Sequence, residues 1–136
     1  MGSLKSGIDN LCILLVEDDL VSQFLMKETL HIWNKSIEIA LASNGKEAIE
    51  ILKNKHCDLI FMDIQMPVMD GYETTEIIRT KFPPAQRNIP IIAMTGQVSF
   101  QYKDNGMNDF ISKPFEAETL FATIEKIIAE HTIIKS

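Results

Sequence analysis

Short apolar runs alternate along this chain with longer stretches in which apolar positions recur every three or four residues. The runs are too short for helices and apolar enough for buried strands of a parallel sheet. They lie at about residues 11–16, 37–42, 58–62, 91–94 and 110–111. The longer stretches predict amphipathic helices at about 20–33, around 48–52, around 74–78 and at about 116–131. This alternation predicts a doubly wound α/β fold, a five-stranded parallel sheet covered on both faces.

Proline and glycine mark where some of these elements should end. Asp70-Gly71 is a turn signal, and Pro83-Pro84 should end the third helix because proline has no N–H for the helical ladder. No repeat or internal linker interrupts the pattern. A chain of 136 residues fits one domain, which we place at 11–132, between a flexible tail at 1–10 and a short tail at 133–136.

Charge and composition narrow the class of protein. The formal net charge of −6 argues against direct binding of nucleic acid, which needs a basic surface. No apolar stretch approaches the roughly 20 residues that span a bilayer, and the first residues do not resemble a secretion signal. We therefore expect a cytoplasmic protein with no direct membrane contact. Cys12 and Cys57, without CxxC spacing, are then expected to be reduced core thiols.

Acidic residues follow two of the predicted strands. Glu17, Asp18 and Asp19 come directly after the first, and Asp63 comes after the third. In open α/β sheets, ligands bind outside the carboxyl ends of the strands, so these carboxylates should converge. Carboxylates that converge cannot all stay ionised without a cation between them, and their oxygens suit a hard ion such as Mg²⁺. The pattern indicates a divalent-metal pocket.

Two more polar residues occupy strand ends, Thr95 after the fourth strand and Lys113 after the fifth. A lysine ammonium and a threonine hydroxyl could hold phosphoryl oxygens, and an aspartate can accept a phosphoryl group as nucleophile. Each residue also has a plainer explanation: Asp19 suits a helix cap, Thr95 could cap the next segment, and Lys113 could be solvated. Their coincidence on one sheet edge favours phosphoryl chemistry.

Four segments carry these residues in a recognisable order. They read ILLVEDD at 13–19, DLIFMDIQMPVMDG at 58–71, MTG at 94–96 and FISKPF at 110–115. In this order they strongly resemble the receiver domain of two-component response regulators, over about residues 11–131. The resemblance implies a flavodoxin-like sheet with strand order 2-1-3-4-5.

The resemblance implies a role for each polar residue. Asp63 would accept a phosphoryl group from a histidine kinase or a histidine phosphotransfer protein. Mg²⁺ would be bound by Asp18 and Asp63 directly, by Glu17 largely through water, and by the backbone carbonyl of Gln65. Thr95 would turn its hydroxyl onto the phosphoryl group, and Lys113 would pair with it.

Further positions match the family's conformational switch. Phe110 would rotate inward as Thr95 moves, and Gln65 and Gln97 match sites that tune the lifetime of the phosphoryl group. The Lys113-Pro114 bond is cis in the family, which proline readily permits.

The sequence departs from the family between Thr95 and Lys113, where it is about four residues short, roughly one helical turn. The fourth helix of the family, expected here at about 98–105 within the segment 96–109, should therefore be stunted. The core chemistry should survive, whereas the usual output surface is altered.

The leading hypothesis is therefore a phosphorylation-dependent signalling switch that catalyses only its own phosphorylation and slow dephosphorylation. It would act on a downstream protein partner, with a phosphorylation-dependent homodimer left open. One alternative is a receiver module of a hybrid histidine kinase acting as an intramolecular relay, and another is a receiver fold that no longer takes phosphate. A haloacid-dehalogenase-type phosphatase is disfavoured because position 65, where its general acid would stand, is Gln.

Overall fold

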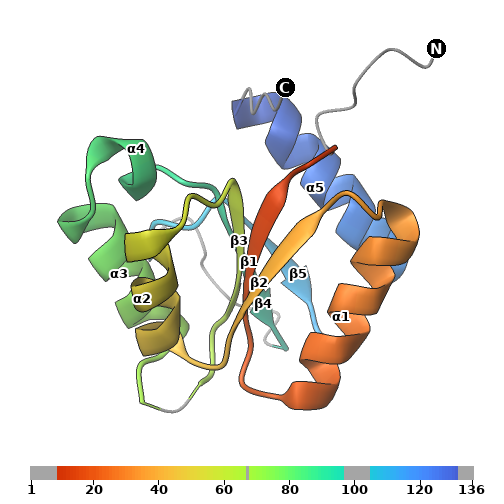
Figure 1. Cartoon of the computed structure of the whole chain (residues 1–136). Helices are drawn as coiled ribbons and strands as arrows, with labels where there is room; N and C mark the ends of the chain where they lie inside the picture. Colours follow the sequence, from red (N-terminus) through yellow and green to blue (C-terminus); the bar gives the residue numbers. More distant parts are fainter. Residues whose placement is uncertain (1–8, 67, 97–104, 132–136) are drawn as a thin grey trace.

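A five-stranded parallel sheet forms the centre of the molecule, as the computed structural model of residues 9–66, 68–96 and 105–131 shows (Figure 1). The strand order β2-β1-β3-β4-β5 confirms the predicted doubly wound topology. The strands are β1 (Cys12–Val16), β2 (Glu38–Ala42), β3 (Leu59–Asp63), β4 (Ile91–Thr95) and β5 (Asp109–Ser112).

Helices cover both faces of this sheet. The helices are α1 (Leu20–Trp33), α2 (Gly45–Asn54), α3 (Gly71–Lys81), α4 (Pro84–Arg87) and α5 (Ala117–His131). Figure 1 shows α1 and α5 on one face and α2, α3 and α4 on the other. Within the described part of the chain, no helix is long and apolar enough to cross a membrane.

The continuous apolar runs of the sequence arise because the sheet is buried on both faces. In β1, Cys12, Leu14 and Val16 join the core under α2 and α3, whereas Ile13 and Leu15 join the core under α1 and α5. Successive strand side chains point to opposite faces, so a strand that is covered twice needs apolar residues at every position.

Three helices begin at polar caps that follow the sheet edge carrying the acidic residues. Asp19, Asn44 and Asp70 are the N-caps of α1, α2 and α3, and each side chain accepts a hydrogen bond from a backbone N–H in the first turn. Asp19 therefore has the capping role expected of it, accepting from the Ser22 N–H at 2.9 Å.

The helix α4 was not predicted. Pro83-Pro84 follows the end of α3, as expected, but Pro84 also begins a four-residue helix. The half-buried Arg79 guanidinium of α3 donates to the carbonyl oxygens of Gly106, Arg87 and Ile89 and to Asn108 Oδ1, at 2.7–3.0 Å. Arg79 thus connects α3 with the α4 segment and with the residues just before β5. Most of the helix expected at 98–105 lies outside the described residues.

Candidate functional site

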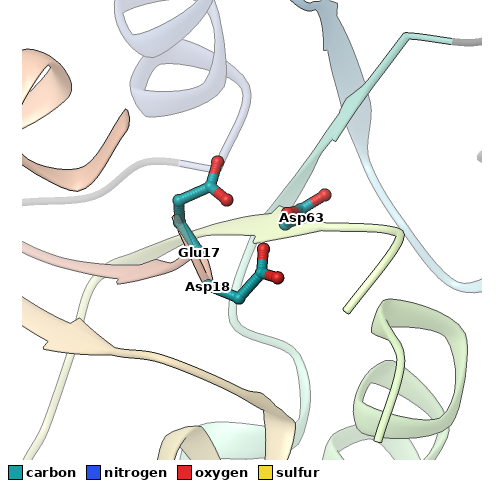
Figure 2. A group of neighbouring side chains, drawn as sticks. All are labelled: Glu17, Asp18 and Asp63. Atoms are coloured by element: carbon teal, nitrogen blue, oxygen red, sulfur yellow. The ribbon is translucent and has the colours of Figure 1, made fainter. Parts of the chain in front are cut away.

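Three carboxylates meet where β1 and β3 end. Glu17 and Asp18 follow β1, Asp63 is the last residue of β3, and one oxygen from each carboxylate lies within 4.8 Å of the others. Figure 2 shows the three side chains converging. Glu17 and Asp63 are buried, whereas Asp18 is exposed to solvent. An all-oxygen donor set open on one side fits a Mg²⁺ ion that keeps several waters.

Lys113, which follows β5, reaches two of these carboxylates. Its Nζ lies 2.7 Å from Glu17 Oε1 and 3.1 Å from Asp63 Oδ2. Its backbone N–H donates to the Thr95 carbonyl oxygen at 2.9 Å, which fixes the start of the loop beside β4. The Lys113-Pro114 peptide bond is cis, in agreement with the expectation from the resemblance.

Glu17, Asp63 and Lys113 shift one another's pKa values in different directions. Burial, together with the hydrogen bond and negative charge of Glu17, raises the pKa of Asp63 to about 7, although Lys113 opposes the change. Burial alone would raise the pKa of Glu17, but its hydrogen bond with Lys113 holds that pKa below the ordinary value. Burial alone would lower the pKa of Lys113, and its contacts with Glu17 and Asp63 raise it instead. Without a metal, Lys113 therefore neutralises mainly Glu17.

The loop after Asp63 is tightly constrained. The backbone N–H of Gln65 donates to Asp63 Oδ1 at 3.2 Å, and the Gly71 N–H donates to the Ile64 carbonyl at 3.1 Å. A Cβ at Gly71 would lie 2.5 Å from the Asp63 carbonyl oxygen, so only glycine allows α3 to begin this close to β3. Val68 has φ = 72°, a left-handed conformation that is costly for a β-branched residue.

The residues expected to respond to phosphorylation lie on β4 and β5, the two strands that follow β3 in the sheet. β3 and β4 pair with Asp63 opposite Met94, so Thr95 extends one residue beyond Asp63 along the sheet edge and is buried. Phe110 pairs with Ala93 across β4 and β5 and is 37% exposed, so its ring is partly outside the core. Gln97, expected to tune phosphoryl lifetime, lies outside the described residues.

One residue of the site was missed by the sequence reasoning. Gln23 of α1 is buried, and its Nε2 donates to the Glu17 carbonyl oxygen at 2.6 Å, which holds the backbone between β1 and α1. A signal was present, since Gln23 shares the inner face of α1 with Met26 and Leu30 at helical spacing. A polar residue on such a face usually has a specific partner.

The fold and this acidic edge define a class of doubly wound α/β proteins that have carboxylates and a lysine together at the carboxyl ends of the strands. The sequence pattern of the response regulator receiver domain matches residues 13–125, so the chain belongs to that family.

Similar proteins place the family in signalling. The chain is 38% identical over 128 residues to hybrid signal transduction histidine kinase K of Dictyostelium discoideum, covering 88% of this chain and 10% of the kinase. It is 36% identical to transcription factor SKN7 of Saccharomyces cerevisiae, covering 87% of this chain and 19% of SKN7. The chain thus spans at most about a fifth of these two relatives.

A solved structure supports the same assignment. The receiver domain of a sensor histidine kinase from Pseudomonas aeruginosa PAO1 superposes with a TM-score of 0.77 at 32% identity, covering 88% of this chain and 98% of that chain. That structure has a magnesium ion coordinated in its active-site cleft. The family is in general a phosphoacceptor switch rather than an enzyme acting on an external substrate.

Proposed function

We propose that this chain is a phosphorylation-dependent switch in which Asp63 accepts a phosphoryl group from a phosphohistidine. The observation that supports this most directly is the contact of one lysine with two buried carboxylates at the end of β1 and β3. One of those carboxylates, Asp63, also approaches the exposed Asp18. In this proposal, Asp63 is the nucleophile, the three carboxylates form the metal site, and the Lys113 ammonium is the cation that pairs with the phosphoryl group.

The proposed transfer uses each of these groups. An Asp63 oxygen attacks phosphorus, the bond from phosphorus to the histidine nitrogen breaks, and the bonding electrons stay on that nitrogen. Glu17, Asp18, Asp63 and the Gln65 carbonyl would hold Mg²⁺, which supplies neutralisation of phosphoryl oxygen charge. The Lys113 ammonium pairs with a second phosphoryl oxygen, since it already lies 3.1 Å from Asp63 Oδ2.

The same phosphoryl group would drive the signal. The Thr95 hydroxyl turns toward the third phosphoryl oxygen, which vacates space near β5 that the half-exposed Phe110 ring then fills. Because phenylalanine has no hydroxyl, this switching depends on packing alone. Slow hydrolysis of the acyl phosphate resets the protein, and the altered surface binds a downstream partner or a second copy of the chain. A cytoplasmic location belongs to the same proposal.

An apolar surface on α1 fits the phosphodonor. Leu20, Val21, Phe24 and Leu25 are 53–72% exposed on the first half of α1, next to the carboxylates. A groove of about 550 Å³ between α1 and α5 continues this surface and is lined at one end by Glu17 and Lys113. Because the groove leads directly to the site, its occupant is proposed to be the histidine kinase or phosphotransfer domain whose phosphohistidine must reach Asp63.

The partial coverage of the relatives leaves two settings for this switch. In one, the chain works as a separate regulator that receives phosphate from another protein. In the other, the same residues act as the receiver module of a hybrid kinase, as suggested by the similarity to hybrid kinases K and M of Dictyostelium. The chemistry at Asp63 is the same in both settings.

The acceptor is tested with beryllofluoride, which mimics an acyl phosphate on aspartate. Wild type should bind it tightly and only with Mg²⁺, as seen by fluorine NMR, and mass spectrometry should find one phosphoryl group after incubation with acetyl phosphate. Asp63→Asn should lose both responses, while Glu125→Gln, which removes one exposed charge from α5, should keep them. A full response in Asp63→Asn would refute the assignment.

The donor surface is tested separately. Phe24→Ala should slow phosphotransfer from a phosphohistidine protein and leave phosphorylation by acetyl phosphate unchanged, because only the protein donor needs the α1 surface. Ile32→Ala is the matched control, since Ile32 is 84% exposed but lies about 12 Å further along α1. Equal slowing by both variants would exclude the proposed surface.

A further inference from the structure

Two thiols lie in contact at the sheet edge opposite the phosphoacceptor. Cys12 is the first residue of β1, and Cys57 comes two residues before β3 begins. Their Sγ atoms are 3.6 Å apart, and the residues are only 5% and 2% exposed. Because β1 and β3 run parallel, Glu17 and Asp63 lie at the other ends of the same strands. The proposed phosphoryl chemistry does not use these cysteines.

The backbone holds the two thiols at a separation that suits a disulfide. The Asp58 N–H donates to the Cys12 carbonyl oxygen at 2.8 Å, and the Cys12 N–H donates to Asp58 Oδ2 at 2.9 Å. Because Ile13 pairs with Leu59, Cys57 is offset by one residue from the position opposite Cys12. A strand spacing of about 4.8 Å and a rise of about 3.3 Å per residue then put the two Cα atoms about 6 Å apart, within the about 4.4–6.8 Å that a disulfide spans. Closing the sulfur separation to about 2.05 Å therefore needs side-chain rotation rather than movement of a strand.

A cavity gives a small reagent access to Cys57. It measures about 380 Å³ and is lined by Cys57, His56, Asp58 and His131, together with residues around α4. His56 Nε2 lies 3.3 Å from Asp58 Oδ1 in the wall of this cavity. A hydroperoxide is small and polar enough to enter such a cavity.

The two thiols differ in access. Cys57 lines the cavity, whereas Cys12 is not among the residues that line it. A hydroperoxide in the cavity therefore meets the Cys57 sulfur first, and Cys12 Sγ, 3.6 Å away, is placed as the resolving thiol.

We infer that Cys12 and Cys57 form an oxidative modification site that takes a hydroperoxide as its co-substrate and closes an intramolecular disulfide. First, Cys57 sulfur attacks one peroxide oxygen, the O–O bond breaks, and the thiol proton leaves with the second oxygen as water or alcohol. Cys12 sulfur then attacks Cys57 Sγ of the sulfenic acid, the S–O bond breaks, and the departing hydroxide takes the Cys12 proton. Two sulfurs lose two electrons in total, and the peroxide gains them.

The disulfide would stabilise the domain from the sheet edge opposite Asp63. It would tie the start of β1 to the segment before β3 and close a long loop that contains α1, β2 and α2. A closed loop restricts the unfolded chain, so the oxidised protein should melt at a temperature higher by about 5–15 °C. The thiols react independently of Asp63, so this inference stands or falls separately from the proposed switch.

The test is oxidation of the folded, full-length chain with a small excess of hydrogen peroxide. Wild type should lose both thiols and about 2 Da, and a non-reducing digest should contain one peptide pair joined through Cys12 and Cys57. Dithiothreitol should restore both thiols. Cys12→Ser should stop at a sulfenic acid on Cys57 that dimedone traps, and Cys57→Ser should react at least about tenfold more slowly, because Cys12 does not line the cavity.

Any of four outcomes would overturn the inference. The thiols could remain reduced until the protein is unfolded by urea, they could proceed to sulfinic acids without a cross-link, or they could join separate chains. Cys12→Ala and Cys57→Ala serve as second variants if a buried serine prevents folding, and circular dichroism verifies the fold of each. If wild type were oxidised only as fast as it unfolds globally, the thiols would be reacting in the unfolded chain, which would also contradict the inference.

Discussion

Removing the charge of Asp63 should stabilise the protein when no Mg²⁺ is bound. Burial and the nearby Glu17 raise the pKa of Asp63 from 3.8 to about 7, so ionising this carboxyl is unfavourable in the folded chain. One pKa unit corresponds to about 1.4 kcal/mol, which places the upper limit of this destabilisation at about 4 kcal/mol above pH 7. Relaxation of the site reduces that figure, and we expect Asp63→Asn to gain ~2–4 kcal/mol in free energy of unfolding.

The gain should depend on pH in a defined direction. Below about pH 4, Asp63 is protonated in both the folded and the unfolded chain, and the variant and wild type should be nearly equal in stability. Wild-type stability then falls relative to the variant as the pH rises from about 4 to about 7, and the difference levels off at higher pH. Saturating Mg²⁺ should shrink the difference, because the cation binds the ionised carboxylate of the wild type.

Urea denaturation in EDTA, followed by far-UV circular dichroism between about pH 4 and pH 8, measures this difference directly. Glu125→Gln is the control for loss of one negative charge, since Glu125 is exposed on α5. The reasoning is refuted if Asp63→Asn is no more stable than wild type at pH 8. It is equally refuted if the gain is the same at every pH.

Three further changes follow from individual contacts, each measured by urea or thermal unfolding. Arg79→Ala removes hydrogen bonds to three carbonyls and to Asn108, and should lower the free energy of unfolding by about 3 kcal/mol. The control Arg87→Ala changes an exposed residue and should lower it by less than about 0.5 kcal/mol. Val68→Gly relieves the φ of 72° and should gain about 0.5–1 kcal/mol; an equal gain in Val68→Ala would contradict this cause. Gly71→Ala should cost about 1–3 kcal/mol and slow phosphorylation, because its Cβ would press on the Asp63 carbonyl; unchanged kinetics would rule out that coupling.

The strands and most helices could be predicted because their signals are local. A strand buried on both faces must be apolar throughout, and the run before Glu17 became β1 with only its first residue excluded. Asp19 could be assigned to a helix cap because capping involves neighbouring residues only. The convergence of Glu17, Asp18 and Asp63 also followed, since parallel strands end at one edge.

The features that were missed depend on contacts between distant segments. The helix α4 is only four residues long, too short for any periodicity, and it packs beside α3, to which Arg79 joins it. The hydrogen-bond partner of Gln23 is the backbone carbonyl of Glu17, and no sequence pattern identifies a backbone partner. Likewise, nothing in the order of residues says that one lysine serves two carboxylates at once, because that depends on side-chain geometry across β1, β3 and β5.

Because Lys113 contacts both Glu17 and Asp63, its ammonium would compete with a divalent metal ion for the same carboxylates. With its ammonium 2.7 Å from Glu17 and 3.1 Å from Asp63, Lys113 already occupies part of the negative potential that would attract a divalent ion. Under the proposed function, a metal ion would therefore bind in competition with a lysine that the fold holds in place. The Mg²⁺ affinity would then be modest, and the free Mg²⁺ concentration, as well as the phosphodonor, would set how readily Asp63 is phosphorylated.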